Sequence, residues 1–248
     1  MHEKASENPS ASIGTLNENS LHASLKDWYA QPGDRLEAQL DGYHIDILRS
    51  DLLIEIQTRN FSAIRSKLAA LCQNYPVCLV HPIIQTKWIQ RTQADGSPVS
   101  RRKSPKSGQP QHLFQEMVRI PHLAAHPNFT LEIVIVHVEE TWCDDGHGSW
   151  RRKNWSITDQ KLLKVIGRKT FNSPSDYLTL LPPGLPPEFT NRDLSDVLRL
   201  PIRVSQRMTY TLQKMDALHI TGKRGNAHTF QVRQRQDTTN QLNGQERR

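Results

Sequence analysis

The sequence predicts an α/β fold, with a mixed β-sheet in a first domain and a small, mainly helical domain after it. Two observations support this prediction. From Leu16 to Ile83 the hydrophobic periodicity gives the order helix, three strands, helix and strand. After about residue 149 it gives three helices and a closing hairpin, an order typical of a winged helix-turn-helix.

The first four elements are predicted to be a helix and a three-strand meander. The helix runs from about Leu16 to Tyr29, and its inward stripe is Leu21, Leu25 and Trp28. Apolar residues then alternate over residues 36–40, which indicates a strand. Asp41-Gly42 is a strong hairpin-turn signal, and it leads directly into a strand that begins at Tyr43.

A second helix and further strands follow the meander. Ser62 is a plausible N-cap for a helix that ends near Asn74, with an inward face of Ile64, Leu68 and Leu71. Val77 to Ile83 is a short apolar strand. Strands near residues 87–91 and 129–138, with a helix near 111–118 between them, are predicted to extend the sheet.

Length and composition bound the class of protein. A chain of 248 residues, with 36% hydrophobic and 23% charged residues, suits one large or two modest globular domains. The net charge of +7 favours a polyanionic partner. Cys72, Cys78 and Cys143 form neither a disulfide framework nor a zinc-binding spacing, which predicts a reducing compartment.

The domain boundaries follow from the same composition. Residues 1–13 and 234–248 are poor in apolar side chains and are expected to be disordered. The first domain covers residues 14–148 and includes a flexible basic loop at 95–111, and the second covers residues 149–233. No stretch has the length and apolarity of a membrane span or a signal peptide, so a cytoplasmic protein without a membrane partner is predicted.

Asp46 and Glu55 are the most informative residues of the meander. If Ser50 and Asp51 form a two-residue turn, Asp46 faces Glu55 across two strands. The core face of this hairpin is then formed by four isoleucines, Ile45, Ile47, Ile54 and Ile56.

Like charges directly opposite each other destabilise a sheet, so this pair needs compensation. A divalent cation is the simplest compensation, because carboxylate oxygens at this separation suit Mg²⁺ or Mn²⁺. The alternative is an exposed hairpin face, or a pair of carboxyl groups that share one proton. The residues alone leave both interpretations open.

Over about residues 16–83 the chain resembles the PD-(D/E)XK nuclease superfamily, which has a restriction-endonuclease-like fold. The resemblance rests on the αβββαβ order, on Asp46 in the second strand and on Glu55-Ile56-Gln57 in the third. It implies that Asp46 and Glu55 bind Mg²⁺ and that Gln57 stands where the family usually has lysine. Ile45 stands where the family's proline would be.

The acid-base chemistry of such a site is the main open point. An amide can orient a water molecule but cannot act as a general base, so Gln57 would position the attacking water. A cation from Arg59, Arg65 or Lys67 is the alternative, and the sequence does not choose among them. Glu18 is a further catalytic candidate, since the family often places a glutamate on the first helix; otherwise it forms a capping box with Thr15.

The second domain gives an independent signal for nucleic acid. Its helices are predicted near residues 158–171, 191–198 and 201–215, followed by a hairpin over 219–232. Between Thr190 and Arg233 there are eight Lys or Arg residues and three Asp or Glu residues. The predicted DNA-binding residues are Arg203, Arg207, Tyr210 and Lys214 on one helix face, with Lys223 and Arg224 at the hairpin tip.

Together these patterns predict a Mg²⁺-dependent DNA-processing protein, an endonuclease whose winged helix binds duplex DNA. Because winged helices commonly work in pairs, a homodimer is compatible with this interpretation. One alternative is a non-catalytic DNA-binding regulator or scaffold with a degenerate nuclease core, which Gln57 favours. Another is a protein-interaction module whose basic charge is incidental. The sequence does not separate DNA from RNA.

Overall fold

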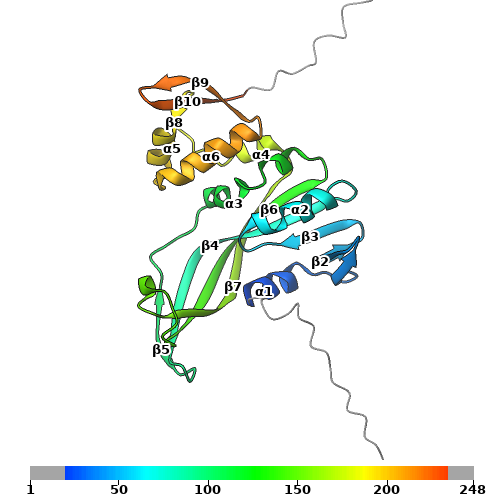
Figure 1. Ribbon diagram of the computed structural model, residues 1–248, viewed down its shortest axis with the longest axis vertical. Helices are drawn as coiled ribbons and strands as arrows, with labels where there is room; N and C mark the ends of the chain where they lie inside the picture. Colours follow the sequence, from blue (N-terminus) through cyan, green and yellow to red (C-terminus); the bar gives the residue numbers. More distant parts are fainter. Residues whose placement is uncertain (1–19, 234–248) are drawn as a thin grey trace, which may run out of the picture.

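The computed structural model describes residues 20–233, which form a large mixed sheet with helices on both faces and a smaller C-terminal unit (Figure 1). The predicted α/β class is confirmed. Glu18 and the polar ends predicted at 1–13 and 234–248 lie outside the described residues. No helix among the described residues is long and apolar enough to cross a membrane.

The first six elements have the predicted order. They are α1 (Ser20–Tyr29), β1 (Arg35–Leu40), β2 (Tyr43–Arg49), β3 (Leu52–Ile56), α2 (Phe61–Leu71) and β4 (Val77–Thr92). Asp41 and Gly42 have φ values of 50° and 81°, the left-handed conformation that a two-residue hairpin turn requires. The predicted cap is wrong, because Asn60 and not Ser62 precedes the first turn of α2.

Further strands and short helices complete this unit. They are β5 (Pro98–Lys103), η1 (Pro110–Leu113), α3 (Phe114–Met117), η2 (Pro121–Ala125), β6 (Phe129–Cys143), η3 (Trp150–Arg152) and β7 (Ser156–Phe171). The predicted helix at 111–118 corresponds to η1 and α3, and the predicted strand at 87–91 is the second half of β4.

The strand order of the sheet is β1-β2-β3-β4-β6-β7, and β5 pairs with β4 off this path. β3, β4 and β6 run parallel to one another, while the remaining neighbours are antiparallel, so the sheet is mixed. The loop predicted at 95–111 therefore contains a strand. β5 is exposed along its whole length, so it has no hydrophobic periodicity from which to predict it.

The helix predicted near 158–171 is wrong, because this segment is the edge strand β7. Its apolar residues have helix-like spacing, yet the segment pairs with β6 along its length. The register shifts where Leu163 and Ile166 have no partner, and these two bulged side chains break the period of two. The segment from residue 149, assigned to the second domain, thus contributes a strand to the large sheet.

The C-terminal unit begins after β7. Its elements are α4 (Pro174–Leu178), β8 (Phe189–Thr190), α5 (Asn191–Leu198), α6 (Ile202–Lys214), β9 (Leu218–Arg224) and β10 (Ala227–Val232). The predicted helices at 191–198 and 201–215 and the hairpin at 219–232 are confirmed. The Thr190 hydroxyl accepts a hydrogen bond from the Asp193 amide at 3.2 Å, which caps α5.

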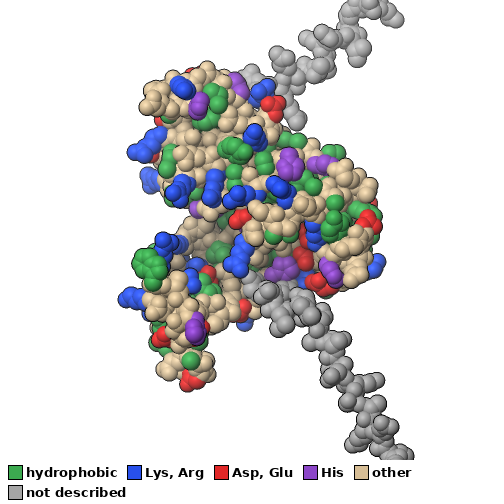
Figure 2. All heavy atoms as spheres, in the orientation of Figure 1, with side chains coloured by type: hydrophobic (Ala, Val, Ile, Leu, Met, Phe, Trp, Pro, Cys, Tyr) green, Lys and Arg blue, Asp and Glu red, His purple; other side chains and the backbone are tan. Residues whose placement is uncertain are grey.

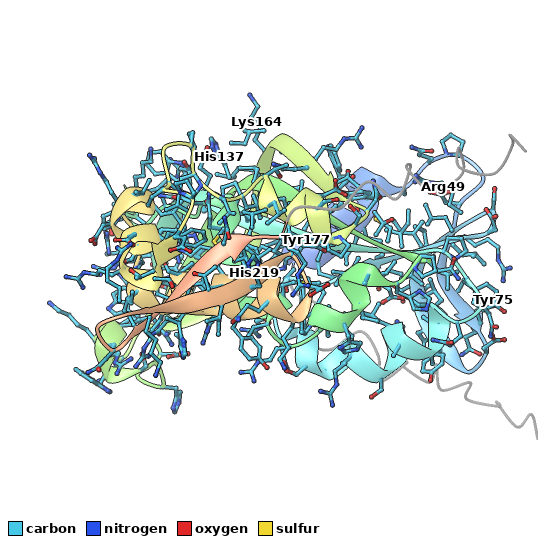
Figure 3. The ribbon with its side chains drawn as sticks, turned by 90° about the horizontal axis from the view of Figure 1, so that it is seen from above. Arg49, Tyr75, His137, Lys164, Tyr177 and His219 are labelled. Carbon is cyan, nitrogen blue, oxygen red and sulfur yellow. The ribbon has the colours of Figure 1, made fainter. Side chains whose placement is uncertain are left out.

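Two hydrophobic clusters lie on opposite faces of the sheet. One contains Leu21, Leu25 and Tyr29 of α1, packed on β3, β4 and β6. Tyr29 takes the inward position predicted for Trp28, whose side chain is 46% exposed. The other cluster continues from α2 and α3 into α6 and β10, so both units share it. Figure 3 shows Tyr177 of α4 inside this region, whereas Lys164 of β7 points away from the molecule.

Candidate functional site

Asp46 and Glu55 come together where the β2–β3 ladder ends. Arg49 pairs with Leu52 and Ile47 with Ile54, which confirms the predicted register up to this point. Beyond Ile54, β3 continues beside β4. The Ile56 amide donates a hydrogen bond to Asp46 Oδ2 at 2.7 Å, so a side chain of β2 replaces the next ladder contact.

This ending also changes which residues share a face. Ile47, Ile54 and Ile56 pack in the cluster beneath α1, but Ile45 packs in the cluster beneath α2. The single face predicted for all four isoleucines is therefore wrong. The alternation of β2 is interrupted at Asp46, the residue whose carboxylate bonds to the main chain of β3.

Glu55 is buried, with a side chain 6% exposed, which excludes an exposed hairpin face. Lys67 of α2 donates a hydrogen bond to Glu55 Oε2 at 2.6 Å and a second hydrogen bond to the His44 carbonyl. Glu55 Oε1 is buried and has no hydrogen-bond partner in the described structure. Burial and the neighbouring Asp46 charge raise the pKa of Glu55 to about 7, in spite of Lys67.

The pKa of Asp46 is shifted in the opposite direction from that of Glu55. Burial would raise the pKa of Asp46, but hydrogen bonds from His22 and the Ile56 amide outweigh it and lower the pKa. His22 Nε2 on α1 lies 3.3 Å from Asp46 Oδ2. Near neutral pH the pair therefore holds one ionised carboxylate, Asp46, and one carboxyl group, Glu55, that is close to its midpoint.

The Gln57 side chain forms no described hydrogen bond with Asp46 or Glu55. Its Nε2 donates to the carbonyl of Arg59 at 2.5 Å and lies 3.4 Å from that of Asn60. The main-chain carbonyl oxygen of Gln57 lies 2.7 Å from Nδ1 of the buried His81. Of the three alternative cations near the site, the structure places Lys67 beside Glu55.

Two groups bear on the site in ways that the sequence did not single out. The sequence analysis did not identify His22. It lies three residues before the buried Leu25, so it shares the inward face of α1, and a polar residue on such a face indicates a candidate site residue. Lys67 was one of three options, and it precedes the buried Leu68 on the helix that covers β3.

The two carboxylates suit a hard divalent cation, because Mg²⁺ binds through one or two carboxylates and completes its shell with water and phosphate oxygens. The buried, unpartnered Oε1 of Glu55 faces no competing donor. Within residues 20–233, no cluster of three or more His, Cys, Asp or Glu side chains forms a metal site. The fit therefore rests on Asp46 and Glu55.

The predicted DNA-binding face of α6 forms a second site. Arg203, Arg207 and Tyr210 line a groove of about 370 Å³ together with Arg119, which follows α3. We call these four residues the basic groove. Lys214 lies 5.7 Å from the centre of the Tyr210 ring, at the end of the same face. Arg119 was missed because only the packing of α6 against α3 brings it there.

The hairpin tip behaves differently at its two basic residues. Arg224 forms an ion pair with Asp193 of α5 at 3.0 Å, so its charge is partly compensated within the protein. Lys223 is exposed and pairs through the main chain with His228 across the hairpin. Lys223 is therefore the tip residue that remains available to a phosphate.

Comparison with known proteins places the unit of the large sheet, from α1 to β7, in a family. A model described as "Domain of unknown function (DUF8091)" matches residues 19–172, which begin just before α1 and end just after β7. An "Uncharacterized protein" of Treponema pallidum (strain Nichols) is 33% identical over 184 residues, which cover 74% of this chain and 73% of that protein. No solved structure matches the chain.

Proposed function

The chain belongs to the DUF8091 family, and we propose that it is a Mg²⁺-dependent DNA-processing protein, an endonuclease that hydrolyses phosphodiester bonds. In this proposal the unit that ends at β7 has a restriction-endonuclease-like core, and the C-terminal unit is a winged helix. The observation on which it rests is the pair of the half-buried Asp46 and the buried Glu55, with the Lys67 ammonium beside it.

Each residue of the pair has a defined part in the proposed reaction. Asp46 and Glu55 would hold Mg²⁺, and His22 and the Ile56 amide fix the Asp46 carboxylate. When bound, Mg²⁺ supplies neutralisation of the charge that develops on the phosphate. Lys67 opposes the rise in the Glu55 pKa, and it adds positive charge at the same place. The Gln57 amide bonds to main chain, so it positions water only if that loop rearranges.

The basic groove supports DNA as the substrate. Three arginines converge there, and the structure gives none of their side chains a carboxylate partner among the described residues. Arginine side chains without an internal partner are suited to phosphate oxygens. Such contacts are independent of sequence and weaken with salt.

A non-catalytic DNA-binding protein is the second candidate, and one contact favours it. Lys67 already compensates the charge of Glu55, so this core persists without a metal ion. A scaffold of this type would bind DNA through the basic groove and leave it intact.

Plasmid nicking separates these two candidates. Wild type, Asp46→Ala and Glu55→Ala are compared in Mg²⁺ and in EDTA, with the exposed Glu188→Ala as a matched control. We expect nicking only in Mg²⁺, only for wild type and the control. Nicking that persists in both site variants would show that the activity arises elsewhere. DNA binding without nicking, and without Mg²⁺ uptake by calorimetry, would establish the second candidate.

A further inference from the structure

The large sheet extends beyond the core as a separate lobe (Figure 1). It is built from the ends of β4, β6 and β7, from β5, and from residues 144–155, and we call it the distal lobe. Thr92 pairs with Cys143, and Cys143 with Ser156, so all three long strands reach this end. Neither Asp46 nor Glu55 lies on these strands, so the proposed hydrolysis does not explain the lobe.

Among the large hydrophobic residues of the described segment 20–233, Trp150 is the most exposed, at 79%. It begins the turn η3, which also contains Arg151 and Arg152 and is followed directly by Lys153. Two other tryptophans of the lobe are covered, because Arg101 lies 4.2 Å from the centre of the Trp88 ring and Arg91 lies 4.9 Å from that of Trp155. The Arg151 guanidinium likewise lies 5.4 Å from the centre of the Trp150 ring, but Trp150 is still 79% exposed, whereas Trp88 and Trp155 are half-buried.

The turn that carries Trp150 is held by its own main chain. The Lys153 amide donates to the Trp150 carbonyl at 3.0 Å, and the Gly148 amide donates to the Asn154 carbonyl at 2.9 Å. Arg152 Nε also donates to the Trp155 carbonyl at 3.0 Å. An exposed indole on a fixed turn loses little freedom when another ring packs against it.

A hollow separates the distal lobe from the C-terminal unit. Figure 2 shows Lys and Arg side chains along the margin below α5 and α6, and hydrophobic and basic side chains on the facing margin of the lobe. In Figure 1 the turn between β6 and β7 lies beside β5 at this margin. The basic groove is formed where α6 lies beside Arg119, which follows α3. A concave basic surface fits a strand of nucleic acid, whereas a membrane surface needs a convex or flat one.

We infer that Trp150 stacks on an unpaired base of a nucleic acid that lies in this hollow. The preferred substrate is then DNA that carries a single-stranded segment, such as a fork, and an uninterrupted duplex lacks this one contact. Bases within a duplex are already stacked on each other, so an open indole gains a partner only where a base is unpaired. Arg151 lies over one face of the ring, so the base would stack on the other face, and Arg151 and Lys153 would contact the adjoining phosphates. This inference rests on the proposed function.

Fluorescence anisotropy in EDTA, which prevents hydrolysis, tests it with three DNA probes of equal length: a duplex, a single strand and a fork. Trp150→Ala should weaken binding to the single strand and the fork about tenfold and leave duplex binding within about twofold. Trp150→Phe, which keeps an aromatic ring, should retain most of the affinity. The matched control is Trp28→Ala on α1, since Trp28 is also exposed, at 46%.

A stacking signature separates this contact from a merely structural role. A 2-aminopurine base in the unpaired arm of the fork should be quenched by wild type and not by Trp150→Ala. Equal losses on duplex and fork, or unchanged binding in Trp150→Ala, would overturn the inference and leave the proposed function standing. Wild type that binds none of the probes would overturn both. Sedimentation with phosphatidylserine vesicles that depends on Trp150 would assign the indole to a membrane surface instead.

Discussion

Lys67 of α2 and Glu55 of β3 form an ion pair of 2.6 Å in which the glutamate side chain is 6% exposed. Loss of one partner would leave a buried charge without compensation, which costs roughly 3 kcal/mol. Lys67→Met should therefore destabilise the protein at pH 8, and less at pH 6, where Glu55 is mostly protonated. Urea unfolding measures this, with the exposed Arg65→Met on the same helix as control. Equal losses at the two pH values would contradict it.

Lys67→Met should also lower the rate of Mg²⁺-dependent nicking by on the order of 100-fold, because positive charge near the phosphate is lost. Binding of the same DNA in EDTA should stay within about twofold, since Lys67 does not line the basic groove. A variant that loses binding and nicking together would place Lys67 in substrate binding instead.

The pKa of Glu55 predicts a pH-dependent stability. Burial and the Asp46 charge raise the pKa of Glu55 from 4.5 in the unfolded chain to about 7 in the folded protein. The protonated Glu55 therefore contributes its full stabilisation of the fold below pH 4.5, and this stabilisation is lost as the pH rises through 7. The loss amounts to about 3 kcal/mol. In metal-free buffer, Glu55→Gln should lose less stability than wild type between pH 5 and pH 8. Glu188→Gln, at an exposed site, should follow wild type, and parallel curves for all three proteins would refute the prediction.

Mg²⁺ should stabilise the wild type. At a hundredfold excess over its dissociation constant, a ligand that binds only the folded state adds about 2.7 kcal/mol, which raises Tm by roughly 5 °C. Asp46→Asn should abolish the increase, whereas Asp144→Asn, in an exposed loop, should keep it. Differential scanning fluorimetry in Mg²⁺ and EDTA gives the comparison, and an increase that survives in Asp46→Asn would exclude this pair as the ligand.

Arg119 should contribute to DNA binding as much as Arg203 and Arg207, since the three line one groove. Each single alanine variant should reduce the slope of log affinity against log salt by about one. Arg192 of α5, 77% exposed and paired with Asp196, is the matched control and should leave the slope unchanged. A normal slope in Arg119→Ala would confine the contact to α6.

The hydroxyl of Tyr177 is buried without a hydrogen-bond partner in the described structure, although its ring stacks on Phe171 at 4.6 Å. Removal of an unpaired buried hydroxyl relieves a desolvation cost, so Tyr177→Phe should increase the free energy of unfolding by about 1 kcal/mol. Tyr75→Phe removes a partnered hydroxyl, 2.9 Å from Asp41, and should not stabilise. Stabilisation by both variants would point to a general effect of tyrosine replacement.

The sequence predicted the elements whose burial follows one regular period. The hairpin register at Ile47 and Ile54, the turn at Asp41-Gly42 and the helix α6 follow from alternation, left-handed turn residues and helical spacing. The strand β7 was missed because bulges at Leu163 and Ile166 give a strand the apolar spacing of a helix.

The candidate sites were predictable only in part, since contacts between distant segments complete them. Asp46 and Glu55 lie on adjoining strands, so local pairing was enough to bring them together. His22 and Arg119 reach their sites through the packing of α1 on the sheet and of α6 on α3. No local pattern specifies such packing, which depends on the whole core.

One continuous core joins the two units, because Phe114 and Met117 pack in the same cluster as Met208, Leu212 and Phe230. Rotation of the C-terminal unit relative to the sheet would break this shared packing. In the proposed function, this shared core would hold the arginines of the basic groove at a constant distance from Asp46 and Glu55. Products should share one length measured from the position that these arginines bind, whatever base sequence lies between.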